Sequence, residues 1–248
     1  HRDLHSFPTR RSSDLSKCTR FEHNLEKQHI EVAIAGTVKA GKSSLINALL
    51  DTEFASVDST PETSVLAKYR TTSDESYIRV RFYTEQMWQK VWSEAQRSSI
   101  YIDEYRALNA DVERSKWIGQ SDYYKYGLDI PELQAELSKF TSSKSPIHFF
   151  AREVEVGIHS DLFPNDVYLV DTPGLDDVVE TRSNITKEYL DKADAVLACI
   201  KEKDIHEASE TKFISRVMAN RSDWKTLFVI ATDRKSTRQN SSHIRRSR

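Results

Sequence analysis

Apolar and polar residues follow two different patterns along the chain. Short runs rich in Val, Ile, Leu and Ala, bounded by turn residues, are typical of strands. Segments in which apolar residues recur every three or four positions indicate amphipathic helices. Strands are predicted at 30–35, 64–71, 77–84, 152–159, 166–171, 194–200 and 226–231. Helices are predicted at 16–28, 45–50, 85–96, 131–140, 183–193 and 206–219.

The order of these segments predicts the fold class. Strands that alternate with helices favour an α/β fold, with a mostly parallel sheet that helices cover on both faces and that has one antiparallel edge. The runs at 64–71 and 77–84 flank the turn sequence Ser-Asp-Glu-Ser, which suggests a hairpin. Residues 51–63 are rich in turn residues and are expected to form a loop, whereas 97–130 shows no clear pattern.

Two aromatic groups stand out from this pattern. The stripe of Met, Trp and Val residues in 87–92 has helical spacing, which favours packing on the core over a membrane or partner face. Tyr123, Tyr124 and Tyr126 fit either an interface patch or a tyrosine-rich loop.

The two ends of the chain have neither a helical nor a strand period. Residues 1–15 and 233–248 are rich in Arg and Ser and resemble translated sequencing-adapter DNA, with Gln239 where Leu would be expected. The alternative is a pair of disordered tails. The prediction of the fold is therefore confined to 16–232, and the native protein is expected to continue past residue 232.

The net charge becomes clearly acidic once these two ends are left out. The chain of 248 residues carries 36 Lys and Arg and 38 Asp and Glu, a formal charge of −2. The ends hold 9 of the basic and 3 of the acidic residues, so 16–232 keeps 27 basic and 35 acidic side chains, a charge of −8. An acidic domain argues against binding to nucleic acid, so no nucleic-acid partner is expected.

Other features of the composition exclude further classes of protein. The chain has no run of about 18 apolar residues, the length that a membrane-spanning helix needs. Cys18 and Cys199 are too few for a disulfide framework, which fits a cytoplasmic location. Cys199 lies in an apolar run and is expected to be a small core residue. The histidines have no ligand spacing that would indicate a zinc site.

A glycine-bounded loop joins the first predicted strand to the helical run after it, and it matches G-x-x-x-x-G-K-[ST]. Glycines let the backbone curl so that its N–H groups face phosphate oxygens, and the helix N-terminus adds positive partial charge. Lys42 would reach the β- and γ-phosphate oxygens, and the hydroxyl of Ser43 would bind Mg²⁺. The candidate phosphate-binding residues are Gly36, Thr37, Val38, Lys39, Ala40, Gly41, Lys42, Ser43 and Ser44.

A second motif, Asp-Thr-Pro-Gly at 171–174, ends another apolar strand. Asp171 stands where a Walker-B carboxylate would hold Mg²⁺, and the N–H of Gly174 could bond the γ-phosphate. The loop between the two motifs should supply a threonine that caps Mg²⁺ and orients water. Thr63 is the preferred candidate because it directly precedes the next strand, and Thr60 is the competitor.

These motifs together resemble the GTPase domain of the dynamin superfamily, most of all that of bacterial dynamin-like proteins. The segments that carry the resemblance are IEVAIAGTVKAGKSSLINALL, the Pro-Glu-Thr loop at 61–63, VYLVDTPGL and ADAVLACI. The resemblance implies a P-loop NTPase fold over 30–232, truncated at its C-terminus, with a helical insertion at about 85–150. The segment 16–29, with the N-terminal helix that the apolar spacing predicts, would precede this domain.

The same resemblance implies a function. It predicts Mg²⁺-dependent hydrolysis of GTP, a nucleotide-dependent dimer formed across the active site, and membrane remodelling. Peripheral contact with the membrane would be made by regions outside this chain.

Two positions bear on catalysis: Lys39 departs from the pattern of dynamins, whereas the absence of a glutamine at Leu175 is shared with dynamin-like enzymes. Lys39 occupies a loop position where dynamins have a small polar residue and where related large GTPases have an arginine that acts in cis. Lys39 is therefore a candidate catalytic residue, which would supply positive charge in the transition state; the alternative is a solvated side chain. Leu175 follows Gly174 where a glutamine would orient water, so slow turnover is expected without a partner.

The motif that recognises guanine is missing. It has the form [TN]-K-x-D after an apolar strand, and Thr232 stands where it should begin. Asp233 has the wrong spacing and is assigned no role. Guanine specificity therefore rests on the family resemblance alone.

Two other classes of function remain open from the residues themselves. One is a GTPase that assists ribosome or RNA assembly, which the acidic charge disfavours. The other is a scaffold that binds nucleotide without hydrolysing it, which the intact Lys42, Ser43 and Asp171 disfavour.

Overall fold

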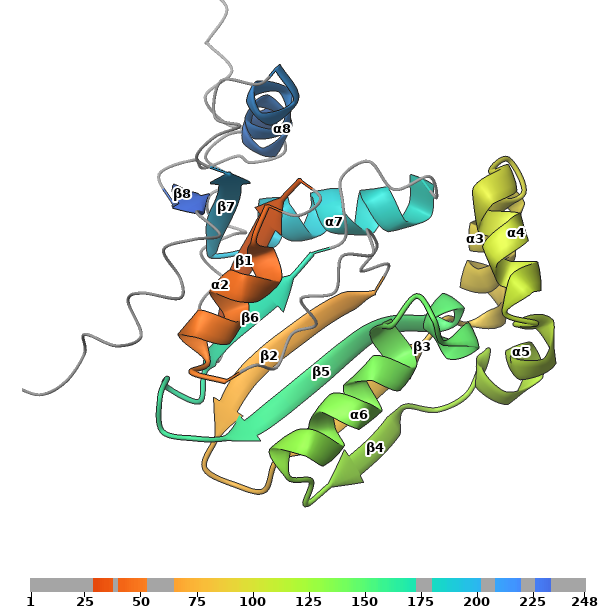
Figure 1. Cartoon of the computed structure of the whole chain (residues 1–248), viewed down its shortest axis with the longest axis horizontal. Coiled ribbons are helices and arrows are strands. Elements are labelled where there is room, and N and C mark those ends of the chain that lie inside the picture. Colours follow the sequence, from red (N-terminus) through yellow and green to blue (C-terminus); the bar gives the residue numbers. More distant parts are fainter. Residues whose placement is uncertain are drawn as a thin grey trace, which may run out of the picture.

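The computed structural model describes residues 29–37, 40–52, 65–172, 180–201, 208–219 and 226–232. Within them one 8-stranded sheet has the order β4-β3-β5-β2-β6-β1-β7-β8 (Figure 1). The strands are β1 (Ile30–Gly36), β2 (Leu66–Thr72), β3 (Tyr77–Phe82), β4 (Tyr123–Tyr126), β5 (Ala151–His159), β6 (Val167–Asp171), β7 (Ala195–Lys201) and β8 (Leu227–Thr232). The helices are α2 (Lys42–Leu49), α3 (Glu85–Ala95), α4 (Ser99–Ala107), α5 (Asp111–Trp117), α6 (Ile130–Thr141), the 3₁₀ helix η1 (Pro146–Phe149), α7 (Glu180–Lys192) and α8 (Ala208–Ala219).

The predicted α/β fold class is confirmed, and every predicted strand is present. Predicted and observed ends differ by no more than three residues in the strands and helices that the structure describes. The helix predicted at 16–28 and most of the loop predicted at 51–63 lie outside the described residues. The segment 97–130, which had no clear pattern, contains α4, α5 and β4.

The sheet changes direction in its middle. β1 pairs in parallel with β6 and β7, and β7 pairs in parallel with β8. β2 is antiparallel to β6 but parallel to β5, and β3 is antiparallel to both β5 and β4. Antiparallel pairing is therefore not confined to one edge, as predicted, but also occurs inside the sheet. In Figure 1 the arrowheads of β1, β6 and β7 point to the upper end, and those of β2 and β5 to the lower end.

The predicted hairpin of β2 and β3 is wrong. The two strands are joined by the short turn at 73–76, but β5 lies between them and pairs with both. β5 contacts both neighbours through its side chains: Val154, Val156 and Ile158 are buried in the core cluster. On its other face, Glu153 lies 3.8 Å from the Lys68 ammonium on β2 and 2.7 Å from the Arg81 guanidinium on β3. The alternation along each strand was visible in the sequence, but these long-range partners were not.

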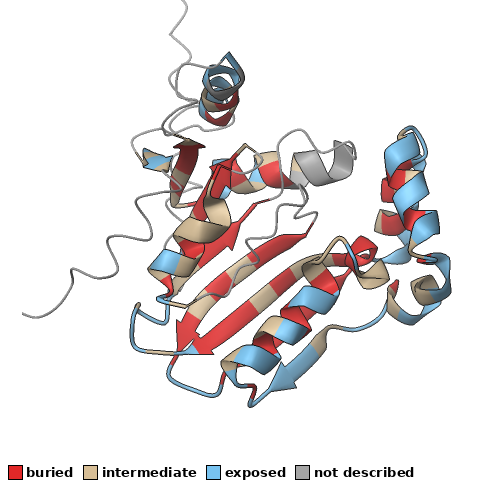
Figure 2. Ribbon diagram, viewed as in Figure 1, coloured by how far each residue is buried: buried red, intermediate tan, exposed pale blue. Residues whose placement is uncertain are grey.

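Successive residues of β1 point to opposite faces and so meet different helices. Ile34 packs with Ile46 of α2 and Leu133 of α6 in one core cluster. Ala33 and Ala35 face the other way, toward a cluster that includes residues of α7 and α8. Figure 2 shows the buried residues concentrated in the sheet, with exposed residues on the outer sides of the helices.

A third cluster forms the helical projection seen at the right of Figure 1. Trp88 and Val91 of α3 are buried there against aromatic residues of α4 and the 3₁₀ segment, including Tyr105 and Phe150. The predicted packing of this stripe on a core is thus confirmed. The aromatic rings tie the projection to the start of β5, which begins directly after Phe150.

In the part of the sheet formed by β2, β5 and β3, one face packs against α6. The opposite face carries charged side chains instead of an apolar layer. Lys68 lies 3.1 Å from Glu31, and Arg81 lies 3.6 Å from Asp122. Together with Glu153, these groups form a row of alternating sign across the strands. Each charge in the row faces an opposite charge, which offsets the cost of its partial burial. Among the described residues, the helices lack the combination of length and hydropathy that a membrane span requires.

We predict that Gly157→Ala destabilises the fold by about 1–3 kcal/mol, because the new methyl group would overpack the sheet. Gly157 of β5 is the register partner of Tyr77, whose ring lies over it, and a Cβ would come 2.1 Å from that ring. The measurement is urea unfolding. In a Tyr77→Ala background the same change should cost little, and an equal cost in both backgrounds would contradict the explanation.

Candidate functional site

The loop after β1 brings the predicted phosphate-binding residues to the upper end of the sheet. β1 ends at Gly36, and α2 begins at Lys42. The ammonium group of Lys42 donates to the backbone carbonyls of Gly36 at 3.0 Å and Thr37 at 3.2 Å. The lysine that is expected to bind phosphate therefore folds back over its own loop.

The turn into α2 depends on a glycine. Gly41 is the N-cap of α2 and has φ of 87°, a left-handed conformation that residues with a Cβ rarely adopt. A Cβ at Gly41 would also come 3.1 Å from the Cβ of Thr232. The turn thus favours glycine at the second position of the motif, and the approach of β8 leaves little room for a side chain there.

Asp171 reaches the same end of the sheet because β6 runs parallel to β1, with Asp171 opposite Ile34. The Asp171 side chain is buried, and its Oδ1 atom has no hydrogen-bond partner within the described structure. Burial raises the pKa of this carboxyl to about 6, and the positive charge of Lys42 opposes the rise. A buried carboxylate that lacks a donor is available to a ligand.

Two threonines tie neighbouring strands to this loop. Thr172, the residue after β6, donates to the Ile34 carbonyl of β1 from its N–H at 3.3 Å and from its hydroxyl at 3.1 Å. The Thr232 hydroxyl of β8 lies 2.6 Å from the Ala40 carbonyl and 3.1 Å from the Ile200 carbonyl. Sequence reasoning gave neither residue a role in holding the loop, although Thr172 stands in the second motif and Thr232 where the base-recognition motif should begin.

Cys199 lies beneath the site and is fully buried, as the sequence predicted. Burial raises the pKa of its thiol to about 12, so the reactive thiolate is disfavoured.

The structure brings most of the predicted site residues together. Those that it describes are Gly36, Thr37, Ala40, Gly41, Lys42, Ser43, Ser44 and Asp171. Those that lie outside the described residues are Val38, Lys39, Thr60, Thr63 and Gly174.

The described residues fit a magnesium ion that is shared with phosphates better than one held by protein alone. They contain no group of three or more His, Cys, Asp or Glu side chains that could hold a metal. Mg²⁺ in nucleotide sites is typically bound by one or two protein oxygens together with phosphate oxygens and water. The partnerless Oδ1 of Asp171 and the hydroxyl of Ser43 provide such oxygens.

A strand, a glycine turn, a lysine at the first position of the next helix and an acid at the end of the neighbouring parallel strand define a P-loop NTPase. Comparison with known proteins specifies the family. The model of the dynamin family matches residues 32–233, so the chain belongs to the dynamin family and is a dynamin-family GTPase domain.

Two curated relatives are bacterial. Dynamin-like protein 1 of Campylobacter jejuni subsp. jejuni serotype O:23/36 (strain 81-176) is 30% identical over 231 residues, which cover 88% of this chain. An uncharacterised protein from the xynA 3′ region of Caldicellulosiruptor sp. (strain Rt8B.4) is 23% identical over 209 residues, 84% of this chain. The aligned parts span 30% and 41% of the lengths of these relatives, respectively.

Solved structures share the fold. Two chains from structures described as an oligomerised bacterial dynamin pair, with a mechanism for the long-range sensing and tethering of membranes, match with TM-scores of 0.64 and 0.60. Their sequences are 23% and 22% identical to this one. Each match covers 92% of this chain, and the matches cover 38% and 32% of those chains.

We predict that Asp171→Asn stabilises the ligand-free protein by up to about 3 kcal/mol near pH 7.5. The folded protein holds the carboxyl proton more tightly than the unfolded chain does, because burial raises the pKa from 3.8 to about 6. The ionised carboxylate therefore costs stability above about pH 6, and this cost disappears below about pH 4.

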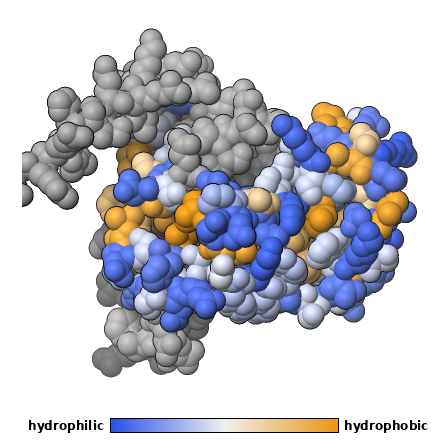
Figure 3. Space-filling view, turned by 60° about the horizontal axis from the view of Figure 1, so that its bottom comes forward, coloured by the Kyte–Doolittle hydropathy of each residue, from blue (hydrophilic) through white to orange (hydrophobic). Residues whose placement is uncertain are grey.

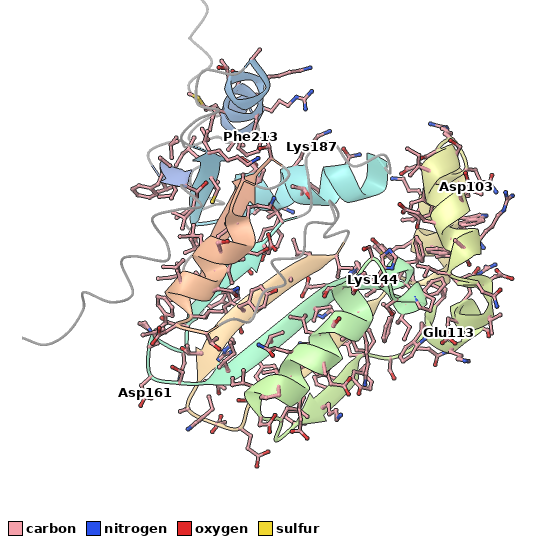
Figure 4. The ribbon with its side chains drawn as sticks, in the orientation of Figure 1. Asp103, Glu113, Lys144, Asp161, Lys187 and Phe213 are labelled. Atoms are coloured by element: carbon pink, nitrogen blue, oxygen red, sulfur yellow. The ribbon has the colours of Figure 1, made fainter. Side chains whose placement is uncertain are left out.

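Urea unfolding of the unchanged chain and of Asp171→Asn, repeated between about pH 4 and pH 7.5, measures how the difference in stability changes with pH. Asp161, labelled at the lower end of Figure 4, is exposed on the turn between β5 and β6, and Asp161→Asn is the matched control with little expected change. A stability difference for Asp171→Asn that does not depend on pH would refute this account.

Proposed function

We propose that this domain binds GTP and hydrolyses its bond between the β- and γ-phosphates. The observation that carries the proposal is the pairing of Lys42, held by two carbonyls of its own loop, with a buried Asp171 whose Oδ1 has no donor. Both groups lie at the end of parallel strands, where ligands bind in open α/β sheets.

Phosphate would be a better partner for Lys42 than the carbonyls are. A hydrogen bond from an ammonium to a charged oxygen is roughly twice as strong as one to a neutral acceptor. Lys42 would therefore leave the carbonyls of Gly36 and Thr37 and contact the β- and γ-phosphates. The backbone N–H groups of 36–44 and of Gly174 would hold the remaining phosphate oxygens.

Ser43, Thr63 and Asp171 would hold Mg²⁺, which supplies positive charge to the phosphate oxygens when it is bound. The carbonyl of Thr63 would orient the attacking water, since Leu175 has no amide to do so. Lys39 would add positive charge near the γ-phosphate.

Guanine as the base is supported by membership of the dynamin family. The Thr232 hydroxyl lies 2.6 Å from the Ala40 carbonyl, so β8 ends beside the phosphate loop, which is where a base-recognition segment would have to begin.

Nucleotide-dependent self-association is the partner interaction that we propose. The two solved neighbours are described as an oligomerised pair, and that pair is described as sensing and tethering membranes. For this protein, contact with a membrane would be made by parts of the native chain outside this domain.

We predict that Lys42→Ala lowers GTP turnover by at least about 100-fold, because charge stabilisation of the transferred phosphate is lost. The measurement is phosphate release with Mg²⁺ and GTP, repeated at low and high protein concentration, where self-association predicts faster turnover per site. Lys144→Ala removes an exposed lysine between α6 and η1, labelled in Figure 4, and should leave turnover unchanged. Equal turnover in all three proteins would contradict the proposed site.

We predict that Lys39→Ala lowers kcat by about 10- to 1,000-fold while nucleotide affinity changes little, since the charge acts on the transition state. Lys39→Arg should retain or raise turnover, because a guanidinium can contact the phosphate with two donors. The experiment measures turnover and nucleotide affinity with and without K⁺, because a lysine that takes the place of a bound monovalent cation would make turnover independent of K⁺. Unchanged turnover in Lys39→Ala would show that this side chain takes no part.

A further inference from the structure

The end of the sheet opposite the nucleotide site has its own pair of parallel carboxyl ends. β2 and β5 run parallel to each other and antiparallel to β6, so they end at Thr72 and His159 far from the phosphate loop. Figure 1 shows their arrowheads at the lower end, and Figure 4 labels Asp161 there and Lys187 toward the other end. The carboxyl ends of parallel strands are a common place for ligand sites.

A cavity of about 840 Å³ lies at this end. Its walls come from β2, the turn after β2, β3, β4 and the end of β5, and they include Arg70, Asp74, Glu75, Tyr77, Tyr126 and His159. The cavity is wide open to solvent, so a ligand would contact the protein with only part of its surface. This end of the molecule comes forward in Figure 3, where hydrophilic areas alternate with hydrophobic ones on the described surface.

The charges of the cavity favour a cation. Asp74 and Glu75 are exposed, and within the described structure neither carboxylate has an ion pair. The one arginine of the lining, Arg70, donates to the Tyr168 hydroxyl at 2.7 Å and to the Thr71 carbonyl at 3.3 Å. Arg70 therefore already has hydrogen-bond acceptors, whereas the carboxylates of Asp74 and Glu75 have no ion-pair partner among the described residues.

The aromatic side chains favour an organic cation over a metal ion. The rings of Tyr77 and Tyr126 lie 6.0 Å apart, and Tyr126 is 59% exposed. Tyrosine rings of the same sheet face already contact cations, since Arg70 lies 5.1 Å from the ring of Tyr168 and Arg79 lies 5.2 Å from that of Tyr124.

The position of Tyr77 is fixed from two sides. Its hydroxyl donates to Glu155 at 2.6 Å, and its ring lies over Gly157, where a side chain would collide with it. A rigid aromatic surface binds at a lower entropic cost than a mobile one.

We propose that this cavity is a second binding site, which takes an organic cation with an alkylammonium or guanidinium group. The ring of Tyr126 would contact the cation, with Tyr77 behind it, and the carboxylates of Asp74 and Glu75 would balance its charge. The site is separate from the nucleotide site, and its existence does not depend on GTP hydrolysis.

The first experiment titrates the whole chain with butylammonium chloride at constant ionic strength and follows amide shifts by NMR. Saturable shifts are expected in the turn at 73–76 and at Tyr77, Tyr126 and His159, and butan-1-ol should not reproduce them. Glu75→Gln and Tyr126→Ala should each weaken binding by about tenfold, the loss expected when a charge pair or a cation–π contact is removed. Glu104→Gln, which changes an exposed acid on α4, is the control and should bind normally.

A second titration identifies the source of the cation. Spermidine represents a free polyamine, and N-acetyl-lysine methylamide represents a lysine side chain of a protein partner. Tighter binding of either one supports the site and assigns its ligand. The proposal is overturned if no cation gives saturable shifts, if butan-1-ol acts equally, or if Glu75→Gln and Tyr126→Ala bind as the unchanged chain does.

Discussion

The parallel hydrogen bonding of β1 to β6 on one side and to β7 on the other determines where the chemistry of this domain can occur. Parallel strands end at the same edge, so the phosphate loop after β1 and Asp171 at the end of β6 must meet. Side chains alternate between faces along a strand, so a register slip of one residue would turn Asp171 away from α2. The hydroxyl groups of Thr172 and Thr232 hold this arrangement from both sides, because each contacts a backbone carbonyl of β1 or of its loop.

In this arrangement the ligand-free site lowers the stability of the folded chain. Asp171 is buried without a donor for Oδ1, and Lys42 contacts neutral carbonyls where it could bind a charged group. Both features cost free energy until a charged ligand enters, and the apolar clusters on either side of the sheet must offset that cost. Local rules of sequence and structure are commonly broken in this way at functional sites, where binding recovers the energy.

The reversal of direction between β6 and β2 gives the domain two ends with different character. At the upper end, strand ends and glycine turns present N–H groups and a lysine, which suit an anion. At the lower end, acidic turn residues and tyrosines surround a cavity, and the nearby arginine is already bonded to Tyr168. The charged row that includes Lys68, Glu153 and Arg81 lies on the sheet face between these ends. Each charge on this face lies within 3.8 Å of an opposite charge, which offsets part of the cost of its partial burial.

The sequence by itself determined seven of the eight strands, the helices α2, α3, α6, α7 and α8, the phosphate loop and the acid at 171, because each of these depends on residues that are close together along the chain. It did not predict α4, α5, β4 or η1. Glycine spacing, apolar runs and turn residues are local signals, so they predict where an element lies and which chemistry its end can carry. Only the tertiary structure decided that β5 separates β2 from β3, that Tyr77 rests on Gly157, and that Thr232 holds the carbonyl of Ala40. These pairings join residues from distant parts of the chain, and they form because buried charges, hydroxyls and rings find partners only after the strands have assembled.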